Sequence, residues 1–181
     1  MSEALASLPQ IADQHEFNAQ RWESILSDTT LADLDHHIET DAFGHVIMMP
    51  APGFSHSSRQ ASALFLLQQL LPHGRAQPEC PLSTSGGVKG IDVIWISQDR
   101  LRESQRGELL VKAPEICLEI ASPSNTRDSL LEKKRLYFEA GADEVWISDL
   151  EGKIAFFLST APDSAVPSST LCPEFPSSIH C

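Results

Sequence analysis

Two short apolar segments, residues 91–97 and 115–121, stand out in the hydrophobic pattern because each contains one acid, Asp92 and Glu119. The neighbours of Asp92 are Ile, Val and Trp, and those of Glu119 are Ile, Leu and Cys. These residue types favour a pleated, half-buried backbone, so both segments are predicted to be strands. An unpartnered acid buried in a strand is costly. Either a shared cation offsets that cost, or each acid pairs with a buried Arg or Lys and serves only the fold.

The same pattern predicts the other elements. Helical spacing of apolar residues predicts helices over 15–27, 56–71 and 126–140. Residues 36–41 and 45–49 form a predicted hairpin around Phe43 and Gly44, and residues 144–149 and 153–159 form a further strand pair. This order of elements is typical of an α/β or α+β domain, with a central mixed sheet flanked by helices.

The chain of 181 residues is expected to form one domain over residues 1–160. Residues 161–181 are rich in Pro, Ser and Thr and are predicted to be a loosely structured tail, in which Phe175 is a candidate to dock. Four cysteines without a C-x-x-C spacing indicate neither a zinc site nor a disulfide framework.

The composition limits the partners. A net charge of −12 counts against a broad nucleic-acid-binding surface, so a polyanion would either meet the less acidic later part of the chain, residues 59–181, or need metal ions to bridge it to the protein. An acidic surface can also serve solubility alone. The sequence contains no apolar run of membrane-spanning length and no signal-peptide pattern at residues 1–16, so a cytoplasmic location without membrane contact is expected.

The chemistry-bearing residues are two strand acids, a helix lysine and a hairpin acid. Asp92 and Glu119 offer hard oxygen ligands of the type that holds Mg²⁺ or Mn²⁺. Lys133 lies four residues before Tyr137, so the two share one helix face, which could look toward Glu119. Glu39 could add a further carboxylate, or it could be a solvated strand end. Together these groups favour a metal-dependent phosphodiesterase.

Two further residues are weaker candidates for a functional role. Tyr137 is expected to be a packing residue whose hydroxyl has a partner. His56 could be a ligand or a phosphate contact, but a histidine in the first turn of a helix is usually exposed.

Three segments resemble one known family in their order and spacing: IETDAFGHVIMMPAPGFSH, GGVKGIDVIWIS and APEICLEIASPSNTRDSLLEKKRLYFEAGADEVWISD. Together they resemble the Uma-type family of putative restriction endonucleases, within the PD-(D/E)XK nuclease superfamily, over roughly residues 17–158. The resemblance implies a restriction-endonuclease-like core that binds Mg²⁺ through Asp92 and Glu119. It maps the family's early acid onto Glu39 and its helix lysine onto Lys133.

The sequence departs from that family pattern at two positions. Ile91 replaces the proline before the aspartate, and Ala121 replaces the lysine of the E-x-K motif. Lys133 could substitute for the missing lysine. The resemblance therefore implies a Mg²⁺- or Mn²⁺-dependent endonuclease that cleaves DNA, with a homodimer plausible because cutting two strands favours paired sites. Two alternatives stay open: a nuclease-fold binding or regulatory module, and hydrolysis of another phosphoester.

Overall fold

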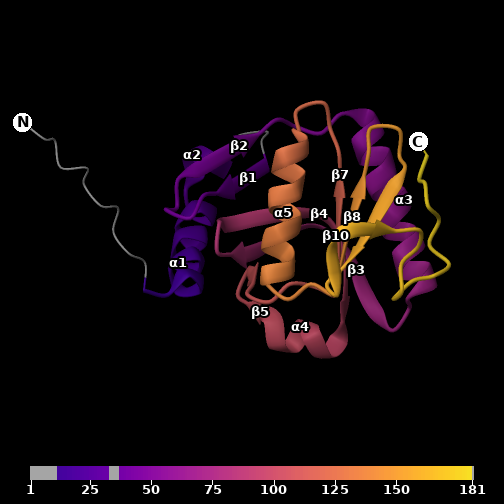
Figure 1. Cartoon of the computed structure of the whole chain (residues 1–181). Helices are drawn as coiled ribbons and strands as arrows, with labels where there is room; N and C mark the ends of the chain where they lie inside the picture. Colours follow the sequence, from indigo (N-terminus) through magenta and orange to yellow (C-terminus); the bar gives the residue numbers. More distant parts are fainter. Residues whose placement is uncertain (1–11, 33–36, 181) are drawn as a thin grey trace, which may run out of the picture.

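The computed structural model describes residues 12–32 and 37–180, and a mixed sheet of eight strands lies at its centre (Figure 1). In spatial order the strands are β10 (Ala161–Val166), β9 (Ile154–Leu158), β8 (Glu144–Ser148), β7 (Ile116–Ile120), β4 (Gly87–Ser97), β3 (Gly74–Thr84), β6 (Leu109–Leu110) and β5 (Gln105–Arg106). The pairs β7–β8 and β3–β6 are parallel, and the other pairs are antiparallel. The predicted mixed sheet is confirmed.

Two long helices cover opposite faces of this sheet. Leu67 of α3 (Phe54–Leu70) belongs to the same core cluster as Leu118, whereas Leu136 of α5 (Arg127–Glu139) packs in a cluster with Cys117. Because consecutive strand residues point to opposite faces, α3 and α5 lie on different sides of β7. The hydroxyl of Thr126 caps α5 by accepting a hydrogen bond from the amide of Ser129 at 3.1 Å.

A smaller layer lies beside the sheet and consists of α1 (Gln14–Leu26), α2 (Thr29–Ala32) and the hairpin of β1 (His37–Thr40) and β2 (Val46–Met49) (Figure 1). Position 36 of the predicted hairpin lies outside the described residues. The amide of Val88 donates to Thr40 Oγ1 at 2.9 Å, which fixes the hairpin against the start of β4. Gly87 allows this approach, because its φ is +98° and a Cβ there would lie 2.4 Å from the carbonyl oxygen of Thr40.

The segment after residue 160 corrects the sequence prediction of a loosely structured tail. Residues 161–166 form β10, which pairs with β9. Further along, Cys172, Phe175 and Ile179 are each no more than 3% exposed and belong to the core cluster that contains Trp146. The short helix α4 (Gln98–Ser104) completes the fold. None of the described helices is long and apolar enough to cross a bilayer.

Candidate active site

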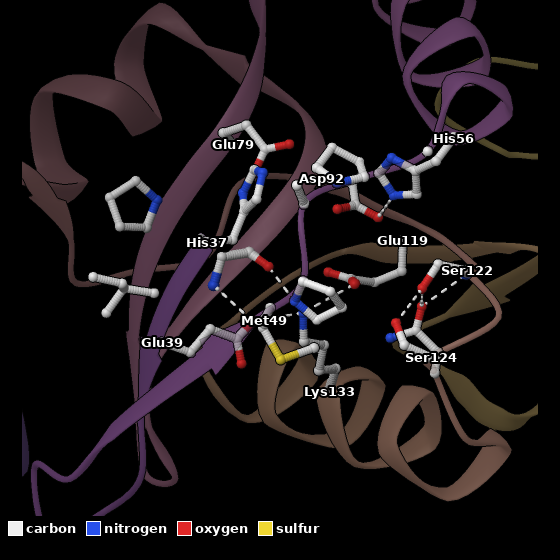
Figure 2. A pocket seen from close by; sticks show the side chains of 18 of the residues that line it. His37, Glu39, Met49, His56, Glu79, Asp92, Glu119, Ser122, Ser124 and Lys133 are labelled. Atoms are coloured by element: carbon white, nitrogen blue, oxygen red, sulfur yellow. Dashed lines mark hydrogen bonds and ion pairs between the residues drawn. The ribbon is translucent and has the colours of Figure 1, made fainter. Parts of the chain in front are cut away.

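Asp92 and Glu119 face each other across neighbouring strands. Val93 of β4 pairs with Leu118 of β7, and extending this antiparallel register by one residue sets Asp92 opposite Glu119. Directly opposed residues of an antiparallel pair project to the same side of the sheet. Figure 2 shows the two carboxylate groups side by side, as the sequence predicts for a shared site.

Hydrogen bonds through one oxygen fix the orientation of Asp92. Its Oδ2 accepts from the amide of Ile120 at 2.7 Å and from Nε2 of His56 at 3.2 Å. The Asp92 hydrogen bond raises the pKa of His56 despite the opposing effect of burial. His56 was expected to be exposed, but its side chain is only 11% exposed and lies in the site. The only sequence signal for this role is a histidine early in a predicted helix.

Glu119 is almost fully buried and is held through both oxygens. The hydroxyl of Tyr137 donates to its Oε1 at 2.6 Å, and Nζ of Lys133 donates to its Oε2 at 3.1 Å. Burial raises the pKa of Glu119 to about 8, although the Lys133 ammonium acts in the opposite direction and the charge of Asp92 adds to the rise. The predicted shared face of Lys133 and Tyr137 is therefore confirmed, and that face looks toward Glu119.

Lys133 joins Glu119 to Glu39. Its Nζ lies 2.7 Å from Glu39 Oε1 and donates to the carbonyl oxygen of Gly90 at 3.0 Å. Burial lowers the pKa of Lys133, but the carboxylates of Glu119 and Glu39 more than offset this effect, so the pKa is raised and the ammonium stays charged. Glu39 is 7% exposed, which excludes the solvated strand end that the sequence left open. Lys89 lies further from Glu39, at 3.9 Å.

These groups line a pocket of about 770 Å³ between the sheet, α1, α3 and the β1–β2 hairpin. Figure 2 shows that β1, β4, β7 and α5 bring Glu39, Asp92, Glu119 and Lys133 to one region of this pocket, with His56 of α3 beside Asp92. All four candidate residues from the sequence therefore meet in space. Their catalytic roles are a separate matter and stay a prediction.

The donor set determines which metal could bind. Within residues 12–32 and 37–180, no group of three or more His, Cys, Asp or Glu side chains is placed to hold a metal ion. Mg²⁺ is commonly held by one or two carboxylates, while waters and substrate phosphates complete its shell. Asp92 and Glu119 fit that requirement, because they are adjacent carboxylates among the residues that line the pocket.

Comparisons with known proteins identify the fold and the family. A crystal structure of a putative nuclease belonging to DUF820 from Anabaena variabilis matches with a TM-score of 0.64 and 19% sequence identity, over 78% of this chain and 86% of that chain. At this identity the likeness shows the fold. None of the curated proteins matches the chain. The model of the Uma2 family, described as a putative restriction endonuclease, matches residues 22–170 and supports a nuclease. Because this match covers most of the sequence, the chain belongs to the Uma2 family.

Proposed function

We propose that the protein is a Mg²⁺- or Mn²⁺-dependent endonuclease that hydrolyses DNA phosphodiester bonds. The observation that carries this proposal is the opposition of Asp92 and Glu119 on adjacent strands, with the Lys133 ammonium 3.1 Å from Glu119 Oε2. The family assignment supports the same class of enzyme. This is also the site that the PD-(D/E)XK resemblance implies.

Charge balance supports a divalent cation at the site. Asp92, Glu119 and Glu39 together carry up to three negative charges, and Lys133 neutralises one of them. A phosphodiester would add a further negative charge to a buried site, where like charges repel strongly. A bound divalent cation would offset these charges, polarise the phosphoryl oxygen and activate a water molecule.

Each side chain then has a distinct task. Asp92 and Glu119 would hold the cation, and the Ile120 amide and His56 orient Asp92 through its Oδ2. Lys133 would stabilise the charge that develops on phosphorus, because its ammonium is positioned beside Glu119. Glu39 is the supporting acid that holds Lys133 in place through a 2.7 Å ion pair.

A plasmid-nicking assay with Mg²⁺ or Mn²⁺ tests the proposal. We expect the wild-type protein to nick DNA, and Asp92→Asn, Glu119→Gln and Lys133→Met each to lose about 100-fold or more in rate. Asp99→Asn and Lys112→Met are matched controls, because both side chains are largely solvent-exposed and lie outside the pocket. Absence of nicking with either cation, or full activity in Asp92→Asn and Glu119→Gln, would reject the enzyme.

One observation favours a second candidate, a nuclease-fold protein that binds without cutting. Lys133 already has three acceptors, on Glu119, Glu39 and Gly90, and Ala121 supplies no second ammonium. Calorimetric titration with Mn²⁺ separates the two functions. Binding that Asp92→Asn abolishes, without any DNA cleavage by the wild-type protein, would favour the binding module.

A further inference from the structure

The pocket that holds the carboxylates continues into an apolar wall. This wall, defined by Trp22, Ile25 and Leu26 of α1, Leu31 of α2, Ile38 of β1 and Met49 of β2, lines the same pocket as Asp92 and Glu119. Leu26 is 53% exposed, so part of this surface is open to solvent. The wall therefore offers apolar area, including the aromatic ring of Trp22, in the same pocket as the carboxylates.

The charged residues of the pocket are poorly suited to binding a phosphate backbone. Five acids line it within the described residues: Glu39, Glu79, Asp92, Glu108 and Glu119. Lys133 is the sole Lys or Arg among the same lining residues, and it is already paired with two carboxylates. Proteins that bind duplex DNA owe most of their affinity to Lys and Arg contacts with phosphates. Apart from the contact that a bound divalent cation would supply, affinity at this site would come from another part of the nucleotide.

We infer that the apolar wall binds an unpaired nucleobase, so that the substrate is single-stranded or locally unpaired DNA. This inference rests on the proposed nuclease function. A base has an apolar face that stacks on aromatic and aliphatic side chains such as those of the wall. In a duplex the same faces are covered by neighbouring bases and cannot reach the wall unless the nucleotide is extruded.

The dimensions of the pocket agree with this occupant. A volume of about 770 Å³ lies within the range of pockets that enclose a small organic molecule, and a nucleotide is of that size. A base held on the wall would leave its phosphate directed to the carboxylate end of the same pocket. Such a substrate would also make the paired sites of a duplex-cutting homodimer unnecessary.

Cleavage of three end-labelled oligonucleotides tests the inference with the full chain and Mg²⁺ or Mn²⁺: a single strand, its perfect duplex, and a duplex with an unpaired internal stretch. We expect the first and third to be cut preferentially. Trp22→Ala should weaken single-strand cleavage by about 5- to 150-fold at low substrate concentration, the range expected for one stacking contact. Phe65→Ala is the matched control, because Phe65 is 66% exposed and lies outside the pocket.

A binding measurement keeps the inference testable when Trp22→Ala does not fold or when nothing is cut. Trp22 is the sole tryptophan among the described pocket residues, and the chain has three tryptophans in all, so quenching of tryptophan fluorescence by an oligothymidylate in Asp92→Asn protein reports on the wall where Trp22→Phe abolishes it. Leu26→Asn should reduce this binding, whereas Leu150→Asn, at a residue 54% exposed outside the pocket, should not.

The outcomes separate the inference from the proposed function. If the duplex is cut as fast as the single strand and neither Trp22→Ala nor Leu26→Asn alters the rate, the inference is wrong although the nuclease stands. If no DNA is cut but single strands quench Trp22 and Leu26→Asn prevents it, the nuclease fails and the nucleobase site stands. Absence of quenching overturns the nucleobase site.

Discussion

In the absence of divalent cations, raising the pH from about 6 to about 9 should destabilise the protein, because it removes a proton from the buried carboxyl of Glu119. Burial raises the pKa of this group from 4.5 to about 8 in the folded chain. The folded state therefore retains a proton that the unfolded chain has already released. Between these two pKa values the folded state binds more protons, so stability falls as the pH rises through 8 and levels off above it.

The size of the effect follows from the shift. Each unit of difference in pKa corresponds to about 1.4 kcal/mol, so the full shift of Glu119 amounts to about 5 kcal/mol across the window. Between about pH 6 and about pH 9, roughly 3 kcal/mol of the free energy of unfolding should be lost. His56 contributes in the same direction, because the hydrogen bond that it donates to Asp92 raises its pKa and its proton is also lost as the pH rises.

Urea denaturation with a chelator present, followed by the fluorescence of the buried Trp146, measures this loss. Glu119→Gln resembles the protonated acid and removes its titration, so its stability should fall by about 3 kcal/mol less than that of the wild type over the same range. Glu103→Gln, at an exposed acid in α4, should follow the wild type. Equal pH profiles for Glu119→Gln and the wild type would show that Glu119 is ionised at neutral pH and would refute the reasoning.

Three substitutions test other parts of the structure. Tyr137→Phe leaves Glu119 Oε1 without its 2.6 Å hydrogen bond and should cost about 1–3 kcal/mol in urea denaturation, whereas no change would contradict that contact. Phe175→Ala removes a ring whose centroid lies 4.7 Å from that of Trp146, and the free energy of unfolding should fall by about 3–5 kcal/mol by the same measurement. A loss typical of an exposed residue would indicate that the segment after residue 160 is not docked. Glu144→Ala strands the amides of residues 170 and 171, and limited proteolysis should then cut the segment after residue 160 faster than in the wild type, with equal rates counting against this anchor.

Local patterns were sufficient for several elements of the fold. Apolar runs of strand type located β7 and residues 91–97 of β4, although β4 begins earlier, at Gly87, and helical spacing located α3 and α5 to within about two residues. The spacing of Lys133 and Tyr137 also fixed which side of α5 would face the sheet.

The C-terminal segment could not be predicted because its order depends on distant partners. Cys172, Phe175 and Ile179 have no strand or helix periodicity, and the Pro and Ser residues around them are typical of a loop. What fixes the segment is the carboxylate of Glu144 on β8, which accepts hydrogen bonds from the amides of residues 170 and 171. Neither amide is marked by its residue type, so the sequence contains no local signal for the contact.

The site was predictable only in part for a similar reason. Residue types suggested acids and a lysine, but the opposition of Asp92 and Glu119 depends on β4 pairing with β7 across an intervening α4, β5 and β6. The contact of His56 with Asp92 depends in turn on how α3 packs on the sheet. Both are tertiary arrangements that no sequence spacing encodes.

The ammonium of Lys133 comes from α5 and not from β7, and this affects what keeps it in place. Residues two apart in an extended strand project to the same side, so a lysine at 121 would be positioned by an extension of the β7 strand alone. Here that residue is Ala121, and Lys133 reaches Glu119 from α5 instead. The position of its ammonium therefore depends on how α5 packs against the sheet, through the buried Leu136 and Tyr137. Glu39, from the separate β1–β2 hairpin, adds a second anchor, so three elements must be in place before the site is complete.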